Sequence, residues 1–93
     1  MIVGICVVKL RIFEADSLKG KRQVIKSLMG RLKSRFNISI AEVGLNDSWK
    51  TAEIGFTLIT NNSNHANEMI SKVINFIDGD NRLEIIEENT EII

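Results

Sequence analysis

The first strand-forming segment restricts the fold more than any other part of the chain. Residues 2–13, IVGICVVKLRIF, are continuous and rich in β-branched side chains, which predicts a buried central strand. One set of alternate side chains is entirely small or apolar, and it comprises Gly4, Cys6, Val8, Leu10 and Ile12. The other set becomes cationic halfway, at Lys9 and Arg11. Because successive side chains point to opposite faces, we expect helices to pack on one face and leave the other partly open.

A basic amphipathic helix is predicted directly after this strand. Asp16 or Ser17 can cap its first turn, because a short side-chain oxygen accepts a hydrogen bond from a free backbone N–H. Apolar residues recur at helical spacing up to Phe36, and Asn37 can end the helix. Gly30, in its interior, predicts close packing against a neighbour. The segment contains no acid, and its seven cations are Lys19, Lys21, Arg22, Lys26, Arg31, Lys33 and Arg35. We expect all seven on the solvent side of the helix.

The remaining segments predict three strands and a second helix. Strands at about 38–44 and 50–60 flank the turn residues GLNDSW. An amphipathic helix at about 64–77 follows, with Gly79 at its C-terminal cap. The last segment, NRLEIIEENTEII, predicts a final strand that is acidic along one edge, which suits the edge of a sheet.

This βαββαβ order predicts an α+β fold. Two right-handed crossovers give a ferredoxin-like sandwich, an antiparallel sheet of strand order 4-1-3-2 with two helices on one face. The chain has no linker-like stretch, so we expect a single domain over residues 1–93. In this topology the start of the first helix, the 44–50 hairpin and the 78–81 turn share one end of the molecule.

Composition excludes several classes of function. A lone cysteine, Cys6, excludes an internal disulfide and a CxxC metal motif. The longest uncharged apolar run is too short to span a bilayer, so we expect a cytoplasmic protein without membrane contact. The only histidine, His65, lies at a predicted helix start, away from the buried Cys6. We therefore predict no catalytic residue, no metal site and no cofactor, and a non-enzymatic protein.

Charge is divided unevenly along a chain whose net charge is zero. Residues 1–36 hold nine cations and two acids, and residues 37–93 hold three cations and ten acids. Two interpretations follow for the basic helix. It contacts the phosphate backbone of RNA or the ribosome, or it pairs with the acidic half of the chain. A third, a small-anion sensor at the shared end of the molecule, also stays open.

The predicted hairpin supplies further candidate contact residues. Trp49 either packs against the base of the hairpin or contacts a partner, and Lys50 follows it. Asp47 either caps the turn or pairs with Lys21 or Arg22 at the shared end.

The open face of the predicted sheet offers no aromatic platform for bases, because its third strand presents Thr51, Glu53, Gly55 and Thr57. RNA contact is therefore expected through the helix. Apolar residues on the same face predict a homodimer surface, and they are Val3, Ile5, Val7 and Ile59.

The stretch from Ser17 to Gly55 resembles the YlxP-like family of small bacterial proteins, a domain of unknown function. The family pattern S-L-K-x-K-R, R-L-K-x-R-F-N, A-E-V and D-x-W falls on Ser17, Leu18, Lys19, Lys21, Arg22, Arg31, Leu32, Arg35, Phe36, Asn37, Ala41, Glu42, Val43, Asp47 and Trp49. Gly20 departs from the larger polar residue common at that position. The resemblance implies a ferredoxin-like fold and a setting among translation and ribosome-maturation factors, without an activity or a catalytic residue.

Overall fold

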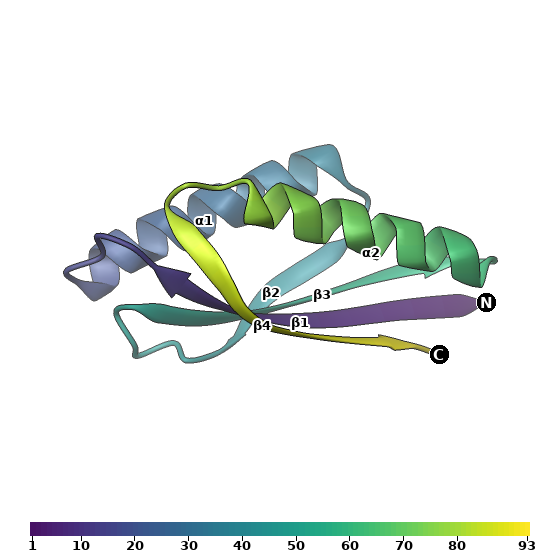
Figure 1. Ribbon diagram of the computed structural model, residues 1–93, viewed down its shortest axis with the longest axis horizontal. Coiled ribbons are helices and arrows are strands. Elements are labelled where there is room, and N and C mark those ends of the chain that lie inside the picture. The colour runs from purple at the N-terminus through teal and green to yellow at the C-terminus, as the bar shows by residue number, and fades with distance from the viewer.

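The computed structural model describes residues 1–93 and contains six elements in the predicted order (Figure 1). They are β1 (Ile2–Ile12), α1 (Leu18–Arg35), β2 (Ser39–Gly44), β3 (Thr51–Thr60), α2 (Ser63–Asp78) and β4 (Leu83–Ile92). Every pair of neighbouring strands is antiparallel, and the sheet order β2-β3-β1-β4 is the predicted order read from the other edge. Both helices cover one face of the sheet, so the ferredoxin-like prediction is confirmed. Neither helix combines the length and apolarity needed to cross a membrane.

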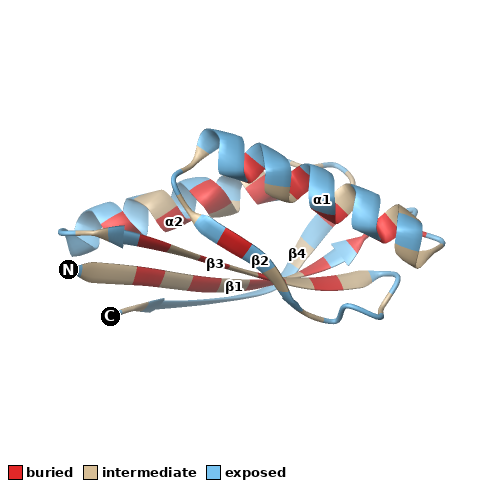
Figure 2. Ribbon diagram, turned by 180° about the vertical axis from the view of Figure 1, so that it is seen from behind, coloured by how far each residue is buried: buried red, intermediate tan, exposed pale blue.

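The core lies between the helices and one face of the sheet, which follows from the alternation in β1. Cys6, Val8 and Leu10 are fully buried, while the residues between them are only half-buried. The β1–β3 register places Phe56 opposite Cys6 and Ile54 opposite Val8, so both strands present their apolar side chains to the same layer. Figure 2 shows the buried positions on the facing surfaces of sheet and helices. Each fully buried aliphatic side chain stabilises the fold by about 1.5–3 kcal/mol.

Short polar side chains set the helix starts. Ser17, one of the two predicted caps, begins α1, and its Oγ accepts a hydrogen bond from the backbone N–H of Gly20 at 3.0 Å. Asn62 begins α2 in the same way, with its Oδ1 accepting from the N–H of His65 at 3.1 Å. At the other end of α1, Phe36 is the extended cap residue, one position before the predicted Asn37.

The prediction of close packing at Gly30 is wrong. Gly30 is exposed, and no heavy atom lies within 4 Å of the place where a Cβ would stand. The close approach occurs at Gly4 of β1, where an added Cβ would lie 3.1 Å from Cδ1 of Ile70 on α2. An alanine at Gly4 would therefore require the Ile70 side chain to move by a few tenths of an ångström where α2 crosses the central strand.

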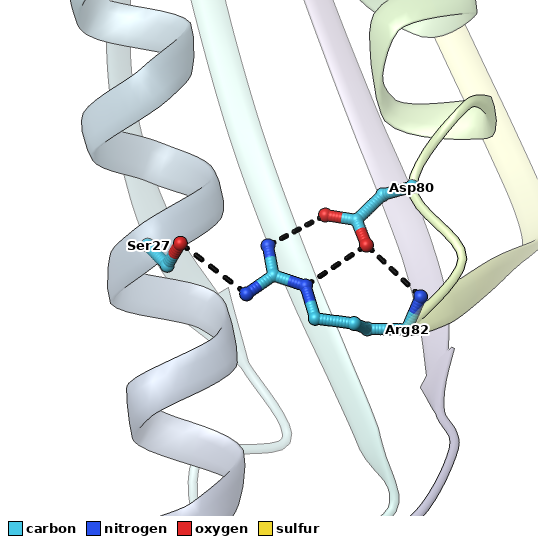
Figure 3. A network of polar contacts seen from close by, with 3 residues as sticks. All are labelled: Ser27, Asp80 and Arg82. Atoms are coloured by element: carbon cyan, nitrogen blue, oxygen red, sulfur yellow. Dashed lines mark hydrogen bonds and ion pairs between the residues drawn. The ribbon is translucent and has the colours of Figure 1, made fainter.

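A polar network ties the α2–β4 turn to α1 (Figure 3). Nε and Nη2 of Arg82 donate to the two carboxylate oxygens of Asp80 at 2.9 and 2.7 Å, and Nη1 donates to Oγ of Ser27 on α1 at 3.3 Å. The backbone N–H of Arg82 also donates to Asp80 at 2.9 Å. The Asp80 side chain is only 6% exposed, and the hydrogen bonds from Arg82 hold the pKa of its carboxyl below the usual value of 3.8.

This lowered pKa predicts a pH-dependent contribution to stability. Ionised Asp80 stabilises the fold above its unfolded pKa, and the contribution is lost as the pH falls through the lower folded pKa. Because Arg82 is more than a third exposed, we expect Asp80→Asn to lower the free energy of unfolding at pH 7 by only about 1–2 kcal/mol. The variant should also lose less stability than wild type when urea unfolding is repeated below about pH 4. Asp78→Asn, an exposed neighbour without an ion pair, is the matched control, and identical pH profiles for the two variants would contradict the assignment.

Candidate functional site

Six of the seven cations of α1 form an exposed surface, which we call the basic face. It comprises Lys19, Arg22, Lys26, Arg31, Lys33 and Arg35. The structure contains three ion pairs, Arg11–Glu84, Lys21–Glu42 and Arg82–Asp80, and none of them involves this face. The solvent-side prediction is confirmed for these six residues.

The seventh cation, Lys21, contradicts the solvent-side prediction. Its side chain is only 1% exposed, although it ends in a charged ammonium group. Lys21 lies four residues before Ile25, so it continues the buried stripe that runs on through Leu28 and Leu32. The helical spacing of Lys21 is that of a buried position, whereas its charge predicted an exposed one.

Lys21 connects α1 to the β2–β3 hairpin. Its Nζ donates to the carbonyl oxygen of Leu45 at 2.6 Å and lies 3.3 Å from Oε2 of Glu42 on β2. That carboxylate oxygen is buried and has no hydrogen-bond partner, so Lys21 balances it by charge alone. Leu45 has a left-handed backbone, with φ of 59°, and its carbonyl also accepts from the N–H of Ser48 at 3.1 Å. The buried ammonium thus holds a strained turn, and it is not available to an external phosphate.

Both predicted roles of Asp47 are wrong. Its side chain is exposed and forms no ion pair, since the acid that meets Lys21 is Glu42. The turn is capped by Ser48, whose Oγ accepts from the backbone N–H of Thr51 at 3.2 Å and lies 2.6 Å from the Thr51 hydroxyl.

Trp49 and Lys50 are both exposed near the tip of the hairpin. The Trp49 side chain is 52% exposed, so the indole is not enclosed at the base of its own hairpin. Lys50 is exposed, and its carbonyl accepts from the N–H of Ile12 at 2.7 Å. Figure 1 shows the start of α1 and this turn at the same end of the molecule, as predicted. A partner contact by Trp49 and Lys50 stays a prediction.

The acids of the C-terminal strand lie far from the basic face. Strand β4 is one edge of the sheet and β2 is the other, with α1 packed over β2 and α2 over β1 and β4. The carboxylates of β4 meet cations of β1 instead, because Glu87 is opposite Lys9 and Glu84 lies 3.5 Å from Arg11. Internal pairing between α1 and the acidic half is therefore limited to Lys21 and Glu42.

The basic face borders two different hollows. Arg22, Lys26 and Lys33 line one of about 480 Å³ beside β2, together with Met29, Gly30 and the acid Glu42. Arg31 and Arg35 lie on the other side of α1 and approach Phe76 of α2. Exposed guanidinium and ammonium groups of this kind donate hydrogen bonds to phosphate or carboxylate oxygens.

The residues with catalytic chemistry do not come together. Nδ1 of His65 lies 3.1 Å from the hydroxyl of Thr60 at the exposed start of α2. Cys6 is buried in β1, where burial raises the pKa of its thiol, and its Sγ accepts from the Thr90 hydroxyl at 3.6 Å. No group of three or more histidine, cysteine or acidic side chains is placed to hold a metal ion.

Comparison with known proteins agrees with the resemblance seen in the sequence. Residues 3–90 match the family described as "Protein of unknown function (DUF503)". The chain is 31% identical over 77 residues to "Uncharacterized protein YlxP" of Bacillus subtilis (strain 168), covering 83% of this chain and 84% of the relative.

Two designed proteins of known structure share the fold. One is the solution structure of a de novo designed protein with a ferredoxin fold, with a TM-score of 0.63 and 15% identity, covering 98% of this chain and 86% of the design. The other, the design Foldit4, has a TM-score of 0.59 and 12% identity over 96% of both chains. Because designed proteins were built for their fold, this likeness extends to the architecture alone.

The buried ion pair predicts a large stability effect at Lys21. Lys21→Met keeps the length of the side chain but leaves Glu42 without its cation and the Leu45 carbonyl without its donor. We expect a loss of about 3–5 kcal/mol in the free energy of unfolding, measured by urea titration. Adding Glu42→Gln should restore at least half of the loss, because both charges are then absent. Lys26→Met, an exposed residue of the same helix, is the control, and a loss below about 1 kcal/mol at Lys21 would contradict the proposed role.

Proposed function

The chain belongs to the family of proteins of unknown function described as DUF503, and we propose that it is a non-enzymatic accessory protein that binds RNA through its basic face. The proposed ligand is structured RNA, of the kind exposed on ribosomal particles. The contacts are hydrogen bonds from lysine and arginine side chains to phosphate oxygens.

No cation of the basic face forms an ion pair within the protein, and this observation carries the proposal. Asp80 interacts with Arg31 through its charge, but its carboxylate is hydrogen-bonded to Arg82. Like charges three or four residues apart destabilise a helix, and a solvated helix surface usually intersperses both signs. Here six cations form no ion pair, while the acids of β4 lie at the opposite edge of the sheet. A polyanion that neutralises these cations gains affinity from the release of its counterions.

The sheet supports contact with backbone phosphates rather than with bases. RNA-recognition sheets of this topology stack bases on exposed aromatic residues. The open face of this sheet presents Thr51, Glu53, Gly55 and Thr57 on β3, in register with Arg11, Lys9, Val7 and Ile5 of β1. No aromatic ring stands among them, so recognition is expected to be largely independent of sequence.

Binding to RNA should therefore fall steeply with salt. We expect the logarithm of the binding constant to decrease with the logarithm of salt concentration, with a slope of about −0.7 to −0.9 per phosphate contacted. Removing two cations by Arg22→Gln with Arg31→Gln should make the slope less steep by about 1.4–1.8 and weaken binding at least about tenfold. Fluorescence anisotropy with labelled ribosomal RNA fragments, and co-sedimentation with ribosomes at two salt concentrations, measure these changes.

The matched control is Lys9→Gln with Arg11→Gln, which removes two cations from the open face of the sheet. This control should bind RNA like wild type. Salt-insensitive binding, or no binding to RNA and ribosomes at low salt, would refute the proposed function.

A second candidate function, a homodimeric interaction module, is favoured by the exposure of Ile59. Its side chain is 68% exposed at the open face, where the β1–β3 register places it beside Val3. Two copies related by a two-fold axis can bury the same apolar surface against itself.

This candidate predicts a mass in light scattering of twice 10.5 kDa at micromolar concentration. Ile59→Lys should restore the monomer, because it would bury an unpaired ammonium in the interface. Ser71→Lys, on an exposed position of α2, should leave the mass unchanged. A monomeric wild-type protein would rule out the dimer and leave RNA binding unaffected.

A further inference from the structure

A groove between the two helices gathers the arginines of the C-terminal half of α1. Phe76 of α2 lies at its centre, with the guanidinium carbon of Arg31 5.6 Å and that of Arg35 5.2 Å from the ring centroid. Phe36 meets the same ring edge to face, with centroids 6.0 Å apart and planes at 83°. Hollows of about 490 and 500 Å³ flank the ring and share Asn75 and Phe76 as lining residues.

The Phe76 ring holds two like charges close together. Arg31 and Arg35 are one helical turn apart, and such a pair repels. Each guanidinium is attracted to the face of the ring, which offsets part of the repulsion and restricts the side chain. Neither guanidinium donates a hydrogen bond or forms an ion pair within the protein, so their planar sets of N–H donors are free for a ligand.

The groups around the ring leave the groove positively charged. Lys72 lines the hollow beside Arg35, and Arg82 lines the hollow beside Arg31. Asp80 is the only acid in the lining of either hollow, and both of its carboxylate oxygens accept hydrogen bonds from Arg82. That carboxylate is therefore already occupied. Asn75, shared by both hollows, adds a neutral amide that can donate or accept.

We propose that this groove is a binding site for the phosphate groups of an RNA strand, with Arg31 and Arg35 as bidentate donors and Lys72 as an additional positive charge. This inference rests on the proposed function, RNA binding, and specifies where on the protein the RNA phosphates bind. Two planar donor groups fixed over one ring match the geometry of phosphate oxygens better than mobile lysines do. The RNA then crosses α1 towards α2, and the cations of the β2 side provide weaker, less specific attraction.

The first test compares two double variants that remove the same charge. Arg31→Gln with Arg35→Gln disables the groove, and Arg22→Gln with Lys26→Gln removes two cations from the β2 side of the same helix. Anisotropy with the labelled ribosomal RNA fragments at fixed salt should show a loss of affinity at least about tenfold larger for the groove pair. The Nε–Hε signals of Arg31 and Arg35 should shift in NMR spectra of the wild-type protein on addition of the same RNA.

A second test changes the ring and leaves the charge intact. Phe76→Leu keeps both arginines but removes the aromatic face that orients them, and we expect a loss of affinity of about three- to tenfold. Phe13→Leu is the matched control, because Arg11 lies 5.7 Å from the Phe13 ring outside the groove. Thermal unfolding of each variant shows whether it folds. If Phe76→Leu does not fold, the double variant of Arg31 and Arg35 still tests the site, because both side chains are exposed.

The outcomes separate this site from the proposed function. Equal losses for the two double variants would overturn the groove and leave RNA binding by the whole basic face intact. Failure of the wild-type protein to bind any RNA would overturn the proposed function, and the site with it. Inorganic phosphate is the second probe. Saturation of the Arg31 and Arg35 signals by phosphate, at concentrations where RNA has no effect, would assign the groove to a small phosphate ligand and overturn its assignment to RNA.

Discussion

The one-sided burial of β1 governs the rest of the structure. Its inward side chains must be covered, so both crossover helices pack on the same face of the sheet. The crossovers then place α1 over the β2 edge and α2 over the β4 edge. Charges that are merely separated along the sequence thereby become separated in space. The basic helix and the acidic strand end at opposite edges of one sheet, where they cannot neutralise each other through direct contact.

Most of the architecture could be predicted because it depends on short-range periodicity. Alternation in β1 and helical spacing in both helices placed each element within one or two residues of its observed bounds. The buried pair was missed because each residue was judged alone. Lys21 continues a helical apolar stripe, and Glu42 follows Ile40 on the inward face of β2. Two residues of opposite sign that each interrupt an apolar pattern on adjoining elements form a recognisable signal for an internal ion pair.

The groove between the helices could not be predicted from the sequence in this way. Phe76 is not one of the buried residues of α2, and its contact with Arg31 and Arg35 depends on how the two helices pack. The turn residues were also misjudged. Asp, Asn and Ser all suit tight turns, and in the structure it is Ser48 that accepts the hydrogen bond from the backbone N–H of Thr51. Local chemistry narrows such choices to a few residues, and tertiary contacts decide among them.

The position of β4 also determines the electrostatic field that the protein presents to a distant ligand. With a net charge of zero it has no monopole, so a remote polyanion experiences only a dipole field that weakens quickly. The two edge strands are three strand spacings apart, about 14 Å, whereas physiological salt screens charge over about 8 Å. At close range the acids of β4 therefore hardly reduce the potential around α1. Capture by a polyanion would then depend on the orientation of the collision, and a protein that is neutral overall would behave as a cation along one edge and an anion along the other.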